Sequence, residues 1–161
     1  MVWFILASII IFVLAAYAAF LMFKLREQNR VQQLIKDQQE QKQLTRDLKT
    51  IDSIVLISKA VNEQQCEISE GCWRLSVLID SMPEHKEIMN SKFPAIFKLY
   101  NEISHMPILE ARKALSKKER LKLDLERMGI EQELEAQVLA DAKLLVTYAS
   151  SIKEDLEQKQ K

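Results

Sequence analysis

The hydrophobic pattern of the chain changes sharply after residue 23. Residues 1–23 (MVWFILASIIIFVLAAYAAFLMF) contain no charged side chain, no Gly and no Pro. A helix that rises ~1.5 Å per residue would reach about 34 Å over this run, enough to cross the ~30 Å apolar core of a bilayer. The alternatives are a cleaved signal peptide, which normally begins with basic residues, and a buried soluble helix. The pattern favours an uncleaved N-terminal transmembrane helix.

The charges that flank this run predict its orientation. Lys24, Arg26 and Arg30 follow the apolar residues directly, whereas no charged side chain precedes them. Basic residues concentrate on the cytoplasmic side of membrane spans, and Trp3 would suit the opposite interface. The sequence therefore predicts a single-pass protein with its N-terminus outside, its C-terminal domain in the cytoplasm, and the lipid bilayer as a partner.

The next part of the chain is polar and then becomes amphipathic. Residues 24–43 are rich in Gln and have few apolar side chains, which predicts a polar helical stalk, with a disordered segment as the alternative. From Leu44 onward, apolar residues recur every three or four positions, as in Leu44, Leu48, Ile51 and Val55. This spacing is typical of a helix that packs one face on a core. We expect one long helix from the membrane segment to about residue 65.

Shorter helices are predicted between residues 67 and 128. Pro83 ends the first of them, and Pro94 suits the first turn of a later one. Ser116 and Glu119 have the spacing of a capping box, and Gly129 is a typical residue just beyond a helix end. The expected segments are a helix at 67–82, a short helix or turn at 84–91, a helix from 94 to Pro107, a short helix at 108–115, and a helix from 116 to 128.

The last segment has the most regular apolar spacing of the chain. Six apolar residues are spaced by four, three, four, three and four positions: Val138, Ala142, Leu145, Ala149, Ile152 and Leu156. Such heptads pair with another long helix, either within the bundle or in a second subunit. A homodimer through helix 130–160 is therefore one expectation.

These patterns predict an all-α protein with no strand. It would comprise an N-terminal transmembrane helix, a long stalk helix and a cytoplasmic bundle of about five helices. The predicted domains are a transmembrane anchor at 1–23, a polar stalk at 24–43 and a helical bundle domain at 44–161.

The charge and cysteine content exclude several functions. The chain has 23 basic and 23 acidic residues, so it lacks the basic surplus of nucleic-acid-binding proteins and no nucleic-acid partner is expected. Cys66 and Cys72 lie six positions apart, a spacing that suits neither a disulfide within a helix nor a zinc site. In the cytoplasm they would stay reduced as small buried side chains.

Enzymatic motifs are scarce. Glu102 and His105 match Glu-x-x-His, but di-iron bundles need two such motifs and two further Glu residues. Neither histidine has a local Ser or Cys partner, and there is no Gly-rich phosphate loop. We therefore predict no catalytic residue, no metal and no cofactor; a metal-binding enzyme is the less favoured alternative.

A basic stretch follows the middle of the chain. Residues 112–122 contain six Lys or Arg side chains. They could contact anionic lipid headgroups or an acidic partner. The interpretation that we favour is two solvated helix ends.

Part of the chain resembles a known family. Four short sequence motifs occur between residues 66 and 131: Glu-Gly-Cys-x-Arg-Leu, His-Met-Pro, Ala-Arg-Lys and Leu-Asp-x-Glu. As a set they resemble an uncharacterised proteobacterial family of short proteins, which have one membrane span and a cytoplasmic helical domain of unknown function. The resemblance implies a bacterial inner-membrane location and brings no activity with it.

The resemblance also suggests a candidate interaction surface. This surface would consist of six polar residues near predicted helix junctions: Arg74, His105, Arg112, Lys113, Asp124 and Glu126. A hydrogen-bonded network that only rigidifies the bundle is the alternative. The function predicted from the sequence is a membrane-tethered helical interaction or adaptor protein with an unidentified protein partner. The second candidate is a single-span accessory or sensor of envelope or cell-division machinery.

Overall fold

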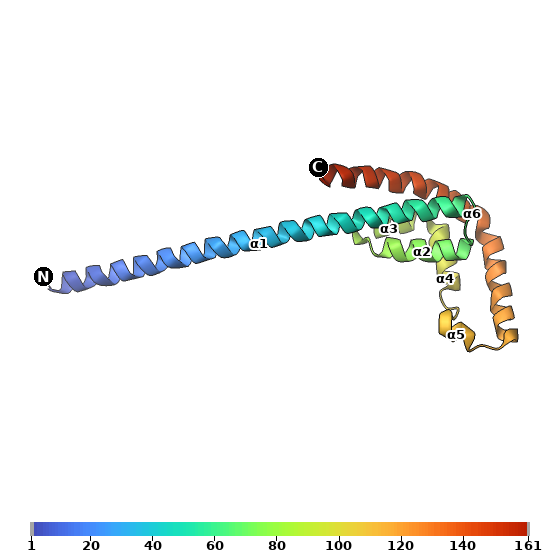
Figure 1. Ribbon diagram of the computed structural model, residues 1–161, viewed down its shortest axis with the longest axis horizontal. Coiled ribbons are helices and arrows are strands. Elements are labelled where there is room, and N and C mark those ends of the chain that lie inside the picture. The colour runs from blue at the N-terminus through green and yellow to red at the C-terminus, as the bar shows by residue number, and fades with distance from the viewer. Residues whose placement is uncertain (1, 161) are drawn as a thin grey trace. The chain divides into compact units, whose positions relative to one another are not determined.

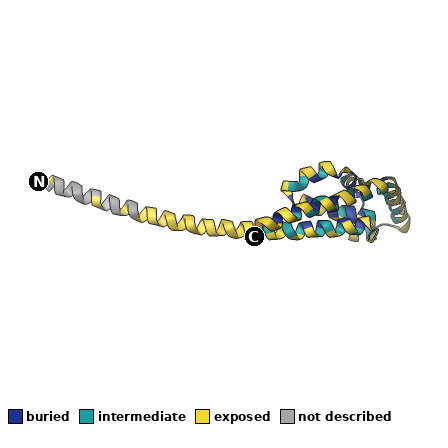
Figure 2. Ribbon diagram, turned by 90° about the horizontal axis from the view of Figure 1, so that it is seen from above, coloured by how far each residue is buried: buried dark blue, intermediate teal, exposed yellow. Residues whose placement is uncertain are grey.

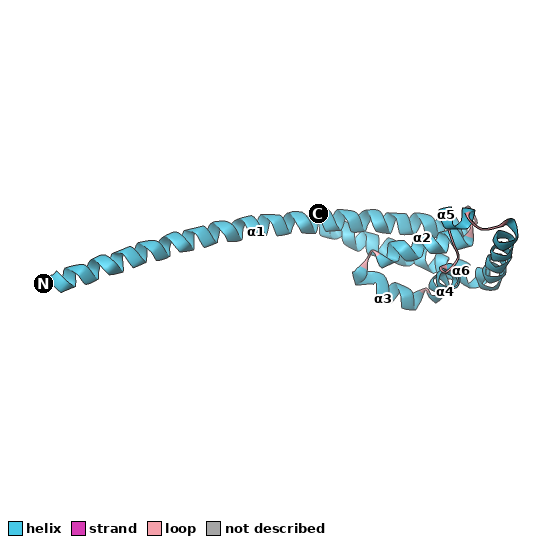
Figure 3. Ribbon diagram, turned by 90° about the horizontal axis from the view of Figure 1, so that it is seen from below, coloured by secondary structure: helices cyan, strands magenta, loops and turns pink. Residues whose placement is uncertain are grey.

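The structure, a computed structural model, describes residues 2–160 as six helices without a strand (Figures 1 and 3). Before residue 20, it describes the side chains of Trp3, Phe12 and Tyr17 alone. The chain divides into two compact units, residues 1–43 and 44–161. The helices are α1 (Val2–Asn62), α2 (Ile68–Asp80), α3 (Pro83–Lys92), α4 (Pro94–Ile103), α5 (Leu109–Lys113) and α6 (Lys117–Gln160). The all-helical prediction is thus confirmed for the described residues.

The unit of residues 1–43 consists of the first part of α1. All of its described side chains are exposed, including Trp3, Lys24, Arg26 and Arg30 (Figure 2). As expected, one long helix contains the apolar run and continues into turns of charged and amide side chains.

The predicted membrane anchor is contradicted. Among the described residues, no helix is both long enough and apolar enough to cross a bilayer. Most side chains of residues 1–19, on which the prediction chiefly depended, lie outside the described residues. The N-terminal transmembrane helix and the single-pass inner-membrane location are therefore corrected by this finding.

The unit of residues 44–161 has one hydrophobic core. On α1, the side chains of Ile51, Ile54 and Val61 are fully buried, as the spacing from Leu44 onward predicts. The red last part of α6 runs beside the green part of α1 in Figure 1, and Lys153 Nζ lies 2.7 Å from Asp52 Oδ1 across this contact. Helices α2, α3 and α4 supply the rest of the core.

The heptad face of α6 is buried within the chain. All six of its regularly spaced apolar residues belong to the core: Val138, Ala142, Leu145, Ala149, Ile152 and Leu156. Pairing inside the bundle, one of the two alternatives, is therefore what the structure shows for this face. A homodimer through helix 130–160 would have to use other side chains and stays a prediction.

The start of α6 is confirmed, but the predicted end at Gly129 is wrong. The Ser116 backbone N–H donates to Glu119 Oε2 at 2.9 Å, and the Glu119 N–H donates to Ser116 Oγ at 3.3 Å, so the capping box forms. The Ser116 hydroxyl also donates to Glu119 Oε2 at 2.6 Å, and this bond, together with the one from the Ser116 N–H, lowers the pKa of the Glu119 carboxyl. Gly129 has no positive φ, which is the conformation that would end a helix there, and α6 continues to Gln160.

Replacing Gly129 with alanine is expected to raise the free energy of unfolding by about 0.5–1 kcal/mol, because glycine costs a helix interior that much. No atom lies within 4 Å of the position that the new Cβ would take. Urea unfolding followed by circular dichroism measures the change. A loss of stability would show that Gly129 has a role in the fold that its open surroundings do not explain.

Helix α4 begins on an acceptor from α6. Pro94 occupies its first turn, as predicted, and the preceding Phe93 provides no side-chain cap. Instead, the Ala95 backbone N–H donates to Asp141 Oδ2 at 2.8 Å, and Ile96 N–H also bonds this carboxylate. Burial raises the pKa of Asp141, against the opposing effect of these two hydrogen bonds.

Candidate interaction cleft

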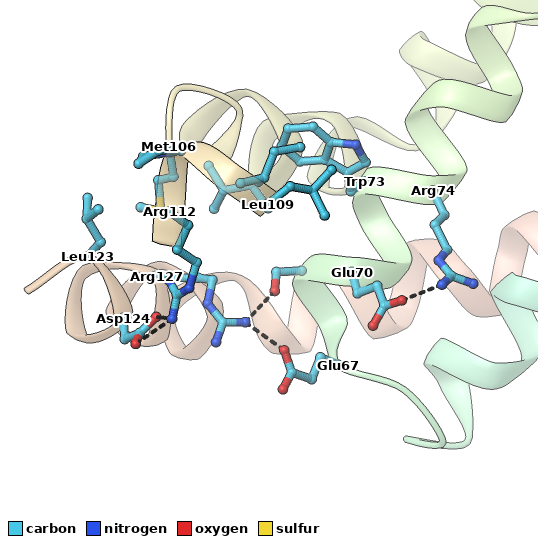
Figure 4. Close-up of a pocket in the computed structure, with 14 residues that line it drawn as sticks. Glu67, Glu70, Trp73, Arg74, Met106, Leu109, Arg112, Leu123, Asp124 and Arg127 are labelled. Carbon is cyan, nitrogen blue, oxygen red and sulfur yellow. Dashed lines mark hydrogen bonds and ion pairs between the residues drawn. The ribbon is translucent and has the colours of Figure 1, made fainter. Parts of the chain in front are cut away.

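A cleft of about 590 Å³ lies between α2, the segment after α4, α5 and the first part of α6 (Figure 4). All four elements belong to the unit of residues 44–161. Its apolar lining comprises Trp73, Ile103, Met106, Pro107, Ile108, Leu109 and Leu123. Its polar lining comprises Glu67, Ser69, Glu70, Arg74, Arg112, Asp124 and Arg127.

The apolar wall is built around Trp73 of α2. Its ring meets Tyr100 of α4 edge to face, with centroids 5.2 Å apart and planes at 74°, which is a favoured aromatic geometry. In Figure 4 the side chains of Trp73 and Leu109 lie on the same side of the cleft. The contact with Tyr100 holds the Trp73 indole in place and leaves part of it exposed in the cleft.

Arg127 connects α6 to the start of α2. Its Nη1 lies 2.7 Å from Glu67 Oε2, 2.9 Å from Ser69 Oγ and 3.1 Å from Glu131 Oε1. The hydrogen bond to Glu67 raises the pKa of Arg127 further, so the guanidinium stays charged. Two carboxylates neutralise this cation, and the three bonds fix its position.

Arg112 connects α5 to α6 in a similar way. Its Nη2 lies 2.8 Å from both carboxylate oxygens of Asp124. Figure 4 shows the Arg112 and Arg127 guanidinium groups next to each other, each already bonded to a carboxylate. Both cations are thus satisfied within the chain, and the surface left over for a ligand is mainly apolar.

Half of the surface predicted from the sequence lies in this cleft. Arg74, Arg112 and Asp124 line it. Arg74 pairs with Glu70 one helical turn away, at the surface. Whether these residues bind a partner stays a prediction.

The other three predicted residues do not line the cleft. His105 Nε2 lies 3.8 Å from Glu126 Oε1, and Lys113 Nζ lies 2.7 Å from Glu110 Oε1. All of these groups are substantially exposed. Exposed ion pairs of this kind contribute little to stability.

Eleven of the fourteen lining residues were not predicted from the sequence, and Arg127 and Leu109 are two of them. Arg127 has one visible signal, its i, i+4 spacing to Glu131, but its Glu67 partner is 60 positions away. Leu109 has no signal at all. It adopts a positive φ of 48°, which a branched side chain rarely takes, and 77% of it is exposed.

Metal and thiol chemistry would depend on the acidic, histidine and cysteine side chains. Within the described part of the chain, no three His, Cys, Asp or Glu residues are placed to hold a metal ion. Burial raises the pKa of Cys72 to about 12 and also raises that of the half-buried Cys66. Thiols with raised pKa values are poor nucleophiles near neutral pH.

Cys72 is expected to resist alkylation in the folded protein, because it is fully buried and carries almost no thiolate below its pKa of about 12. Cys66 is partly exposed and should react slowly. Timed iodoacetamide labelling, read by mass spectrometry, compares the two, and both should react once the chain is unfolded in urea. Equal labelling rates in the folded protein would contradict the buried position of Cys72.

Two comparisons relate the chain to known proteins. A family model described as protein of unknown function (DUF2489) matches residues 11–145. An uncharacterised protein of Haemophilus influenzae is 30% identical over 154 residues, which cover 94% of this chain and 98% of the relative. No solved structure matches the chain.

Proposed function

We propose that this chain, which belongs to the family of proteins of unknown function DUF2489, acts as a helical protein–protein interaction module without catalytic activity. The cleft described above is its binding site, and the occupant is an apolar side chain of a partner protein. The proposal follows from the chemistry of the lining. The arginines are already bonded to carboxylates, and the free surface is aromatic and aliphatic.

The backbone of Leu109 is the observation that carries this proposal. A left-handed conformation costs a residue with a Cβ about 1–2 kcal/mol. Here that conformation occurs at the first residue of α5, a leucine that is 77% exposed and lines the cleft. Strain held at an exposed apolar residue contributes nothing to the core, and such strain concentrates at binding sites. Leu109 is therefore the residue that a partner is expected to cover.

A photo-crosslinking amino acid at position 109, compared with position 144, tests the proposal in living cells. Leu144 is the matched control, since it is 61% exposed on α6 and does not line the cleft. Crosslinking at 109 should give an adduct of one defined mass, whereas position 144 should give none. A Leu123→Arg change, which places a charge in the cleft, should remove the adduct at 109 without changing the circular dichroism spectrum.

Two results would overturn the proposal. One is the formation of the same adducts at positions 109 and 144, since crosslinking would then not be specific to the cleft. The other is one equivalent of tightly bound metal in the purified protein, which would favour the enzymatic alternative.

A further inference from the structure

We infer that residues 117–133 of α6, named the α6 arm here, bind the same residues of a second copy of this chain in an antiparallel two-fold contact. Figure 1 shows α5 and the orange first part of α6 extending away from the core helices of their unit. The inference goes beyond the proposed function and does not depend on it, because it concerns a different face of α6 from the one that lines the cleft.

The α6 arm has an apolar stripe that stays more than half exposed, although Leu125 and Met128 also line a hollow that they share with the segment 64–68 of their own unit. Leu121, Leu125 and Met128 follow an i, i+4, i+7 course and are 60%, 60% and 57% exposed. This is the spacing by which one helix packs on another. The neighbouring face of the arm, which carries Leu123 and Arg127, is turned into the cleft. The stripe is therefore a second, separate apolar surface.

The charges along the arm are arranged with opposite signs at its two ends. Lys117, Lys118 and Lys122 lie at its start, and Glu133 lies at its end. All four are exposed, and none has an ion pair in the part of the chain that the structure describes. The arm is basic at one end and acidic at the other, with the apolar stripe between them.

The charges of two α6 arms complement each other only when the two arms run antiparallel. Leu125 lies seven residues after Lys118 and eight before Glu133, about 10–12 Å along the helix on either side. A two-fold axis near Leu125 thus places Lys118 of one copy opposite Glu133 of the other, and the two stripes face each other. A parallel pair would instead place lysines against lysines. In a two-fold dimer the same surface patch serves both subunits.

Gly129 provides a second observation on the same part of the arm. Glycine costs the helix stability there, yet no tight contact and no positive φ within the chain require it. It follows Met128 directly, opposite the Leu121 region of the second copy in this pairing. A missing side chain lets two helices approach closely, as small residues do in other helix pairs.

Sedimentation equilibrium of the full chain tests the inference. Concentrations up to about 1 mM are needed, because a contact between two short helical segments binds weakly. The wild type is expected to approach the mass of a dimer. A Leu125→Lys variant should remain monomeric, whereas Leu144→Lys, at an equally exposed leucine of the same helix, should dimerise as the wild type does. Both substitutions are at exposed positions, so both variants should keep the wild-type thermal unfolding midpoint.

A charge exchange separates self-pairing from any other use of the arm. Lys118→Glu and Glu133→Lys should each weaken the dimer about tenfold or less, since each replaces the attraction at two symmetry-related, solvent-exposed pairs by a repulsion. The double variant should restore wild-type dimerisation, because the restored pair forms between copies.

Three results would overturn the inference. These are a monomeric wild type at the highest concentration, equal effects of Leu125→Lys and Leu144→Lys, and no restoration by the double variant. In the last case the arm would serve a different acidic partner. Loss of the position-109 crosslink leaves this experiment unaffected, so the two proposals fail separately.

Discussion

Replacing Gly71 with alanine is expected to destabilise the unit of residues 44–161 by about 1–3 kcal/mol, the usual cost of overpacking a core. A Cβ at position 71 of α2 would overlap Cγ2 of Val61 on α1. Val61 is fully buried and β-branched, so it has little freedom to move away. The overlap should outweigh the ~1 kcal/mol that alanine gains in helix propensity. Urea unfolding measures the loss.

A double-mutant cycle makes this prediction specific. Val61→Ala removes the overlapping methyl group, so Gly71→Ala should cost less in that background, with a favourable coupling of about 1–2 kcal/mol. The matched control is Gly129→Ala, the same substitution at a helical glycine with open surroundings, which should stabilise the protein. If Gly71→Ala raises stability as Gly129→Ala does, the close approach of α1 and α2 does not prevent a residue with a Cβ from fitting at position 71.

Replacing Asp141 with alanine should cost about 2–3 kcal/mol, because hydrogen bonds to a charged acceptor are lost and buried N–H groups remain unpaired. The N–H groups of Ala95 and Ile96, both buried residues, would lose their acceptor at the start of α4. Chemical unfolding of the variant measures the cost. Asp155→Ala, at an exposed acid of the same helix, is the control and should stay within ~0.5 kcal/mol of wild type.

The pH dependence of Asp141 has a definite sign. Burial raises its pKa above the ordinary value of 3.8, so the folded protein binds this proton more readily than the unfolded chain does. The contribution of this carboxyl to stability therefore falls as the pH rises from 3.8 through the raised pKa. Relative to Asp141→Asn, which cannot titrate, the wild type should gain stability as the pH is lowered from about 7. A constant difference across that range would contradict the raised pKa.

Local patterns predicted those parts of the fold that depend on neighbouring residues. The capping box at Ser116, the position of Pro94 and the buried stripe of α6 were all readable from spacing alone. The predicted helix end at Gly129 was wrong because glycine, although typical beyond a helix end, ends a helix only where the chain adopts a positive φ. Nothing in the sequence distinguishes the two situations.

The anchor at residues 1–23 shows a different weakness of local patterns. The pattern predicted one long helix to about residue 65, and the structure has one helix to Asn62, but no described helix is apolar enough over sufficient length to cross a membrane. The prediction of membrane location depended on the apolar run and on Lys24, Arg26 and Arg30, so it is overturned with the anchor.

The cleft could be predicted only in part. Arg112 and Asp124 are 12 positions apart and were both suspected, but the Arg127–Glu67 bond joins residues 60 positions apart. Non-local pairs of this kind leave no periodic trace in the sequence. The strained backbone of Leu109 is likewise set by the fold around it and not by neighbouring residues.

The capping of α4 by Asp141 has a consequence for how the protein is made. During synthesis the α4 residues leave the ribosome well before Asp141, which follows Ala95 by 46 positions. Until α6 emerges, the first turn of α4 lacks its carboxylate acceptor, and the core lacks the apolar face of α6. The α1, α2 and α4 surfaces that α6 covers are thus exposed on the nascent chain, and exposed apolar surface of this kind makes a folding intermediate prone to aggregation.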